Sequence, residues 1–296
     1  MIIVKLIGGL GNQMFQYALG RHLAYKYQTE LKLDIHYLLD RRPREHMIFR
    51  DYDLPIFNIH ENIATKEEIA AFTGRYMSRR KKLIFRLKKL VNEPKIKNEI
   101  TPHFDSKILD AGPSSYLVGF WQSEKYFIDI EGLIRSDFTF KSNLNPKCKE
   151  LAQQIESVNA VCLNIRRADY VTNPLSSKFL GFIGIDYIHR AVEIISEKVE
   201  RPVFFVFSDD ISWCKENIHL SYPSTIVSHE YAGDKFGYYL QLMILCKHFI
   251  IPNSTFAWWA AWLNSNPNKI VIAPKNWVRE SSRYNKDIVP ESWIQI

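Results

Sequence analysis

The stretch Ala160-Val161-Cys162-Leu163-Asn164-Ile165-Arg166-Arg167-Ala168-Asp169-Tyr170 joins a short apolar run to two adjacent arginines and an aspartate. The apolar run predicts a buried strand, and the charges follow where that strand should end. In an open α/β sheet, ligands bind outside the carboxyl ends of the strands, so this order predicts an α/β fold with Arg166 and Arg167 at a crevice. A guanidinium is permanently charged, and its planar fork fits phosphate oxygens. The pair is therefore typical of a phosphate clamp, with Asp169 as its brace or as a catalytic carboxylate. A strand end whose arginines pair with surface carboxylates is the alternative.

Two later apolar runs also end in polar residues. Residues 202–207 are strongly β-prone and lead into Ser208, Asp209 and Asp210. These side chains could contact a ribose or a base, or cap the following helix, and the two roles do not exclude each other. Residues 248–251 lead into Asn253, Ser254 and Thr255 at the start of a tryptophan-rich helix. Hydroxyl groups and free backbone N–H groups at a helix start favour an anion site, and an N-cap before a packed tryptophan stripe is the alternative.

The N-terminal residues have a related order. A predicted strand at residues 2–7 is followed by Gly8-Gly9-Leu10-Gly11-Asn12-Gln13 and then by helical spacing over residues 14–24. Met14 stands where a dinucleotide fingerprint needs its third glycine, and the lysine of a P-loop is absent. Gly9, Gly11, Asn12 and Gln13 therefore predict a cradle for a sugar or a phosphate, because glycine permits close backbone approach and amides bind without charge. A tight turn between strand and helix is the alternative.

The bulk composition is that of a globular protein with room for two domains. Of 296 residues, 46% are hydrophobic and 24% are charged, and the chain shows neither a membrane-spanning run nor a signal-peptide pattern. The polar stretch around residues 140–150 separates two similar strand–helix patterns, so we expect domains at residues 1–145 and 146–280 and a tail, 281–296, that packs back across the boundary. Four cysteines without metal-type spacing favour a reducing cytoplasm.

One segment accounts for all of the net charge of +7, because the rest of the chain is slightly acidic. Residues 75–97 contain ten Lys or Arg and one Glu. Within them, residues 79–91 predict a basic amphipathic helix, which fits either an anionic membrane surface or an ordinary surface helix. The segment has few interleaved aromatic residues and no nucleic-acid-binding motif, which argues against a nucleic-acid partner.

Four blocks together resemble one family. The glycine segment continued through Met14-Phe15-Gln16-Tyr17-Ala18, the Arg166–Tyr170 block, Phe207-Ser208-Asp209-Asp210, and Cys246-Lys247-His248 through Asn253-Ser254-Thr255-Phe256-Ala257-Trp258-Trp259 resemble the bacterial α-1,2-fucosyltransferases of glycosyltransferase family 11. The blocks occur in the family's order and span nearly the whole chain. Asn164 and Ala168 depart from the pattern, which usually has histidine and glycine there, and an acidic residue is usual where Tyr239 falls.

The resemblance implies a GT-B fold of two Rossmann-like domains facing across a cleft, the first on the acceptor side and the second binding a GDP-sugar. It implies an inverting, metal-independent transfer of L-fucose from GDP-β-L-fucose to the 2-hydroxyl of a galactoside, with no cofactor, in bacterial surface glycan or O-antigen synthesis. Arg166 would stabilise the leaving diphosphate with Arg167, Ser254 and Thr255 nearby, Asp169 is the first candidate for the base, and Asn12 would reach donor or acceptor from the opposite domain. The remaining expected donor contacts are Gly9, Gly11, Gln13, Asn164, Ser208, Asp209, Asp210 and Asn253.

Two alternative functions remain. The scaffold could use another acceptor, linkage or GDP-sugar. It could also bind a GDP-sugar without turnover, because Asn164 replaces the hydrogen bond of a histidine but cannot shuttle a proton near pH 7. The expected location is the cytoplasm, or the inner face of a membrane, reached through residues 79–91, if the galactose-terminated acceptor is lipid-linked.

Overall fold

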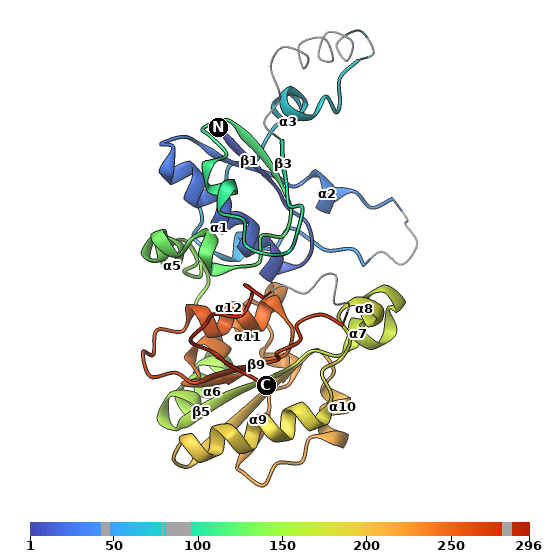
Figure 1. Cartoon of the computed structure of the whole chain (residues 1–296). Coiled ribbons are helices and arrows are strands. Elements are labelled where there is room, and N and C mark those ends of the chain that lie inside the picture. Colours follow the sequence, from blue (N-terminus) through green and yellow to red (C-terminus); the bar gives the residue numbers. More distant parts are fainter. Residues whose placement is uncertain (43–47, 79, 81–95, 280–285) are drawn as a thin grey trace. The chain divides into compact units, whose positions relative to one another are not determined.

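The computed structural model describes residues 1–42, 48–78, 80, 96–279 and 286–296 (Figure 1). The chain forms two compact units, Met1–Thr139 and Phe140–Ile296. The predicted boundary between residues 145 and 146 coincides with the start of helix α6 (Pro146–Ser157). Apart from Arg80, the predicted basic helix at residues 79–91 lies outside the described residues.

The first unit contains a four-stranded parallel sheet in the order β2-β1-β4-β3. Its strands are β1 (Ile2–Lys5), β2 (Leu31–Asp34), β3 (Ile96–Asn98) and β4 (Ser115–Val118). Its α-helices are α1 (Leu10–Lys26), α2 (His36–Leu39), α3 (Lys66–Thr73) and α5 (Glu131–Asp137), and its short 3₁₀ helices are η1 (Leu54–Ile56), η2 (Ser106–Asp110), η3 (Glu124–Tyr126) and η4 (Ile128–Ile130).

Helix α1 begins one turn earlier than the spacing over residues 14–24 predicts. Gly9 is its N-cap, and the backbone N–H groups of Asn12 and Gln13 both donate to the Gly9 carbonyl, at 3.0 and 3.1 Å. The glycine segment is therefore partly a helix N-terminus, whose first turn carries Gly11, Asn12 and Gln13. Asn12 and Gln13 consequently have fixed backbones.

Helix α3 begins with the capping box predicted by the sequence Thr65-Lys66-Glu67-Glu68. The Thr65 hydroxyl accepts from the Glu68 N–H at 3.2 Å, and the Glu68 carboxylate accepts from the Thr65 N–H at 2.9 Å. The helix ends at Gly74, whose φ of 67° is left-handed. Ile69 and Phe72 of this helix then pack on Ile3 and Tyr116 of the sheet.

The second unit contains a six-stranded parallel sheet in the order β10-β9-β8-β5-β6-β7. Its strands are β5 (Asn159–Ile165), β6 (Pro202–Ser208), β7 (Ser224–Ile226), β8 (His248–Ile250), β9 (Val271–Ala273) and β10 (Ile294–Gln295). Its helices are α6 (Pro146–Ser157), α7 (Ala168–Thr172), α8 (Pro174–Phe179), α9 (Ile185–Lys198), α10 (Ile211–Asn217), η5 (His229–Tyr231), η6 (Asp234–Phe236), α11 (Gly237–Leu245) and α12 (Thr255–Leu263).

Helices cover both faces of the second sheet, with α9 on one side and α11 and α12 on the other (Figure 1). Near-continuous apolar strands are typical of such doubly covered parallel sheets. The tryptophans of α12 are core residues, as one reading of the sequence had them, because Trp258 and Trp259 are fully buried. The described part of the tail adds β10 to this sheet, beside β9; packing of the tail across the boundary stays a prediction.

Across the described ranges, no helix is long and apolar enough to cross a membrane.

Gly20 allows α1 to lie close against the first sheet. A Cβ at this position would come within 2.4 Å of Val4 Cγ2 and 2.7 Å of Leu31 Cδ1. We expect Gly20→Ala to lower the free energy of unfolding by about 1–3 kcal/mol, because the added methyl overpacks this contact. Urea denaturation would measure the change. Gly132→Ala in α5 is the matched control: its Cβ meets nothing within 4 Å, so this variant should be neutral or more stable by up to about 1 kcal/mol. Equal destabilisation by both variants would contradict the packing argument.

Candidate functional site

Three polar segments meet at the carboxyl edge of the second sheet. Ile165, at the end of β5, is in register with Ser208 at the end of β6, and β8 flanks β5 on its other side. In the sheet, β6 and β7 lie on one side of β5, whereas β8 lies on its other side. The strand order therefore reverses between β5 and β8, which makes this position the topological switch point. This is the position where open α/β sheets bind ligands.

Arg166 lies between two carboxylates at this edge. Its Nη2 donates to Asp169 Oδ1 at 2.5 Å, and its Nη1 is 2.8 Å from Asp209 Oδ2. Burial alone lowers the pKa of the Arg166 guanidinium, but the charges of Asp209 and Asp169 outweigh that effect and leave its pKa raised. The Arg166 Cζ also lies 5.5 Å from the centre of the Tyr170 ring. The cation is therefore permanent and held in one orientation.

Asp209 and Asp210 fix the backbone and side chain of Arg167. Asp209 Oδ1 accepts from the N–H groups of Arg167 and Ala168, at 2.8 and 3.3 Å. Asp210 Oδ2 pairs with Arg167 Nη1 at 2.6 Å, while its Oδ1 accepts from Trp213 N–H at the start of α10. Asp210 is thus the predicted helix cap and also an arginine partner. The alternative interpretation of the two arginines was that they pair with surface carboxylates. Both arginines are paired, but with carboxylates at the same sheet edge, Asp169, Asp209 and Asp210.

The segment after β8 is joined to this cluster through Tyr170, whose hydroxyl donates to the Asn253 carbonyl at 3.0 Å. The Asn253 side chain is 1% exposed, and its Nδ2 donates to the carbonyls of Leu180 and Trp277, at 3.1 and 3.0 Å. Asn253 therefore positions the segment rather than presenting its amide outward. Ser254 is the N-cap residue of α12, and in the described structure its side chain makes no cap hydrogen bond, so its hydroxyl is not committed to the helix. Thr255, half-buried, is the first residue of that helix.

Asn164 has a local role in the sheet, since its Nδ2 donates to the Phe207 carbonyl at 3.2 Å. It links β5 to β6 one residue before their polar ends. Tyr239, the other departure from the family pattern, is 2% exposed, and its hydroxyl donates to the Val227 carbonyl at 2.6 Å. Both residues thus have structural partners in this chain.

Sequence reasoning missed two aromatic side chains near Ser208. A carbonyl can only accept, so His229 Nε2 donates to the Ser208 carbonyl, at 2.9 Å. The Phe236 ring stands edge-on to His229, with centroids 5.8 Å apart, and is 43% exposed. Phe236 has a φ of 58°, which is unfavourable for a bulky residue and typical of functional loops. The one feature of the sequence that could have indicated a functional loop here is Gly233, which lies in a segment rich in aromatic residues.

The other predicted contacts belong to the first unit. Gly8 has a φ of 80°, and a Cβ there would come 2.4 Å from Asn12 Nδ2. The Asn12 Oδ1 accepts from Gln122 Nε2 at 2.8 Å. Gly8, unlike a larger residue, thus leaves space for the Asn12 amide beside the turn.

Gln13 and Gln16 are fully buried and hold loops in place. Gln13 Nε2 donates to the carbonyls of Gly8 and Asp51, and its Oε1 accepts from Asp53 N–H at 2.9 Å. Gln16 accepts from Ile7 N–H and donates to the Gly119 carbonyl. In this structure the Gln13 side chain therefore positions loops, and its contact with a ligand stays a prediction.

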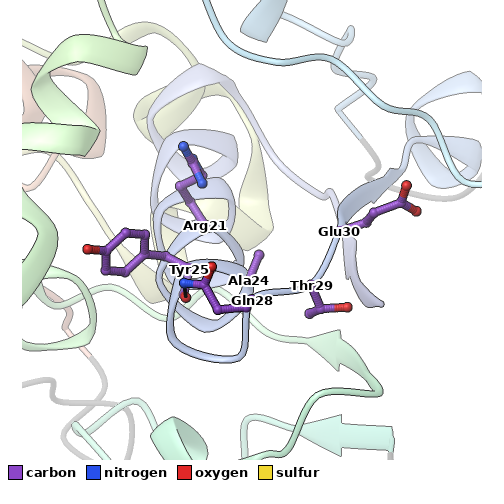
Figure 2. A pocket seen from close by; sticks show the side chains of 6 residues that line it. All are labelled: Arg21, Ala24, Tyr25, Gln28, Thr29 and Glu30. Carbon is purple, nitrogen blue, oxygen red and sulfur yellow. Dashed lines mark hydrogen bonds between the residues drawn. The ribbon is translucent and has the colours of Figure 1, made fainter.

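Metal ligands do not gather in the described residues: no group of three or more His, Cys, Asp or Glu could hold an ion there. A hollow of about 490 Å³ lies at the last turn of α1 and is lined by Arg21, Ala24, Tyr25, Gln28, Thr29 and Glu30 (Figure 2). None of these six is a predicted site residue, and Arg21 is paired with Asp137 at 2.8 Å.

Comparisons with known proteins identify the family of the chain. The model of the family "Glycosyl transferase family 11" matches residues 1–296. The chain belongs to this family. It is 33% identical to an α-1,2-colitosyltransferase of Escherichia coli, over 100% of this chain and 99% of that protein. It is 32% identical to the O-antigen biosynthesis glycosyltransferase WbnK of E. coli, over 98% and 99%. A galactoside α-(1,2)-fucosyltransferase 1 of Sus scrofa is 27% identical over 61% of this chain and 52% of its own length.

Solved structures support the fold prediction. The α-1,6-fucosyltransferase NodZ of Bradyrhizobium, co-crystallised with GDP, has a TM-score of 0.50 at 15% identity, over 92% of this chain and 94% of that chain. The family 11 chain is thus an α/β protein of the GT-B class with two parallel sheets.

We expect Asp209→Ala to destabilise the edge of the second sheet by about 1–3 kcal/mol, because two backbone N–H groups and Arg166 lose a partner. Hydrogen exchange should show faster exchange at the amides of Arg167 and Ala168, and urea denaturation should give the free energy. Glu193→Ala, at an exposed position of α9, is the control and should change stability by less than about 0.5 kcal/mol. Unchanged exchange at both amides would refute the bracing role of Asp209.

Proposed function

We propose that the second unit binds the diphosphate of a GDP-sugar at its carboxyl edge and that the family 11 chain transfers the sugar. The observation that carries this proposal is the orientation of Arg166 by Asp169 and Asp209 at the switch point of the sheet. Arg167, Ser254 and Thr255 belong to the same edge. NodZ, which shares the fold, was co-crystallised with GDP.

The electrostatics of the cluster decide how the donor would bind. Two guanidinium groups face three carboxylates, Asp169, Asp209 and Asp210. Net attraction is therefore not the main force, and directed hydrogen bonds are needed. Among the described residues, no partner is present for the Nε–H of Arg166. That N–H, the Ser254 and Thr255 hydroxyls and the N-terminus of α12 are the donors for phosphate oxygens. The carboxylates suit sugar hydroxyls.

The proposed reaction is the transfer of L-fucose from GDP-β-L-fucose to the 2-hydroxyl of a terminal galactoside by a single inverting displacement. Negative charge develops on the leaving diphosphate as the anomeric bond breaks, and the fixed Arg166 cation stabilises that charge without reorganisation. The α-1,2 linkages in the names of the colitosyltransferase and of the Sus scrofa enzyme support the linkage, and the E. coli O-antigen relative supports a role in surface glycan synthesis.

Asp169 was the first candidate for the general base. Its Oδ1 already accepts a 2.5 Å hydrogen bond from Arg166, so this oxygen is occupied by the arginine. We therefore propose that Asp169 orients Arg166 during the reaction and that another group accepts the proton of the acceptor hydroxyl.

The similarity to the α-1,2-colitosyltransferase supports a second candidate donor, a GDP-linked colitose. Colitose is L-fucose without its 3-hydroxyl, and an α-1,2-colitosyltransferase aligns with the whole chain. A site that hydrogen-bonds the 3-hydroxyl would discriminate strongly against colitose, because its polar partners would be left unpaired. A purely apolar contact there would accept both donors.

We expect Arg166→Lys to reduce kcat at least about 100-fold, because an ammonium cannot keep both carboxylate contacts and the diphosphate geometry. Donor turnover would be measured as GDP release with and without acceptor. Arg190→Lys, on the exposed side of α9, is the control and should keep full activity. Undiminished turnover by the Arg166 variant would refute the diphosphate role.

We expect the purified protein to release GDP from GDP-fucose in the presence of EDTA and a galactoside, and to give an α-1,2-linked product by NMR. The same assay with GDP-colitose would rank the two donors by kcat/KM. Loss of activity in EDTA would refute the metal-independent mechanism. Tight GDP-fucose binding without product across an acceptor panel would favour a silent binding protein.

A further inference from the structure

Phe120 and Trp121 are adjacent aromatic residues with opposite exposures. They follow β4 at the carboxyl edge of the first sheet, in the sequence Gly119-Phe120-Trp121. Trp121 is 2% exposed and packs edge-on against Tyr126, with ring centroids 5.8 Å apart. Phe120 is 41% exposed. A hydrophobic core explains Trp121, but it does not explain Phe120.

The backbone under Phe120 is unusually constrained. The Glu99 carboxylate accepts from the N–H groups of Phe120 and Trp121, at 2.7 and 2.9 Å. Trp121 has a φ of 56°, a conformation that costs a bulky residue of order 1 kcal/mol or more. Burial raises the pKa of Glu99, although the two N–H donors oppose the shift. The buried Glu99 carboxylate and the left-handed backbone of Trp121 thus fix the backbone position of the exposed Phe120 ring.

The residue before Phe120 is fixed as well. Gln16 Nε2 donates to the Gly119 carbonyl at 2.9 Å, and a Cβ at Gly119 would come 2.4 Å from the Glu99 Cβ. The next residue but one, Gln122, donates to Asn12 in the first turn of α1. The segment is therefore tied on both sides to helix α1, while the ring of Phe120 stays accessible.

Phe120 lines a cavity of about 210 Å³ together with Gly8, Tyr37, Phe49 and Arg50. Phe49 is 40% exposed, and the Lys5 ammonium lies 4.8 Å from the centre of the Tyr37 ring. The cavity is smaller than the several hundred Å³ of drug-sized sites, so it suits one sugar ring rather than a nucleotide. Exposed aromatic side chains and the Arg50 side chain in one lining match a pyranose, which has one apolar C–H face and hydroxyl groups around its edge.

We propose that Phe120 is a stacking platform for one hexopyranose ring of the acceptor, bound in this cavity of the first unit. The identity of that ring as the terminal galactose rests on the proposed function. Glu99 and Gln16 are positioning residues, which fix the ring without touching the sugar. The aromatic character of residue 120, more than its size, then sets the acceptor affinity.

The test compares Phe120→Ala, Phe120→Leu and Phe120→Tyr in the full chain. We expect the acceptor KM to rise about tenfold in the Ala and Leu variants and to stay within about threefold in the Tyr variant, because only Tyr retains the aromatic face. Donor KM and acceptor-free GDP release should stay within about twofold in all three. Tyr25→Ala is the control, since Tyr25 is 54% exposed and lines a different hollow of the same unit.

A binding measurement separates this inference from the proposed function. Saturation-transfer NMR with methyl β-D-galactopyranoside should give ring-proton signals for the wild-type chain and the Tyr25 variant, and much weaker signals for Phe120→Ala. This pattern in a chain that transfers no fucose would uphold the cavity and refute the proposed function. Equal signals from wild type and Phe120→Ala, no signal from either, or a rise in donor KM equal to the rise in acceptor KM would overturn the inference.

Discussion

The second unit depends on the pairing of Arg166 with carboxylates from two neighbouring strands. Asp169 follows β5 in the chain, whereas Asp209 follows β6, so the guanidinium adds a side-chain link between two strand ends that the backbone ladder also joins. The same Asp209 also accepts two backbone N–H groups of the arginine segment. An ion pair of this kind is costly if either partner is removed, because the remaining charge is left half-buried. The geometry of the edge is thus maintained by electrostatics before any ligand arrives.

The two units use different polar chemistry at their carboxyl edges. In the second unit, charged side chains from the ends of β5 and β6 face one another. In the first unit, the neutral amides of Gln13, Gln16 and Asn12 connect the start of α1 to residues far along the chain, and the Glu99 carboxylate is buried against backbone N–H groups. Charged groups suit a phosphate-bearing molecule, and neutral donors and acceptors beside aromatic rings suit a carbohydrate. This contrast agrees with a donor held by the second unit and an acceptor sugar by the first.

Sequence alone predicted the features that are local in the chain. The strands β5, β6 and β8 could be found because an apolar run followed by polar residues needs no distant partner to be recognised. The Thr65 cap and the Asp210 cap were predictable for the same reason. The early start of α1 was missed because its N-cap is a glycine, which gives no side-chain signal. The roles of Gln16 and Glu99 were also missed, because their partners lie 103 and 21 residues away in the chain. Nor could the sequence distinguish Phe120 from Trp121, since one backbone torsion decides which ring is buried.

The fixed backbone at Phe120 separates the stability of the fold from the recognition of a glycan, two properties that usually change together. Most of the contacts that hold residues 119–121 involve backbone atoms and the buried side chains of Glu99, Gln16 and Trp121. The exposed ring contributes little to them. Residue 120 is therefore free to vary without loss of the fold, and members of the family could diverge in the glycans they modify through this one position while the scaffold around it stays the same.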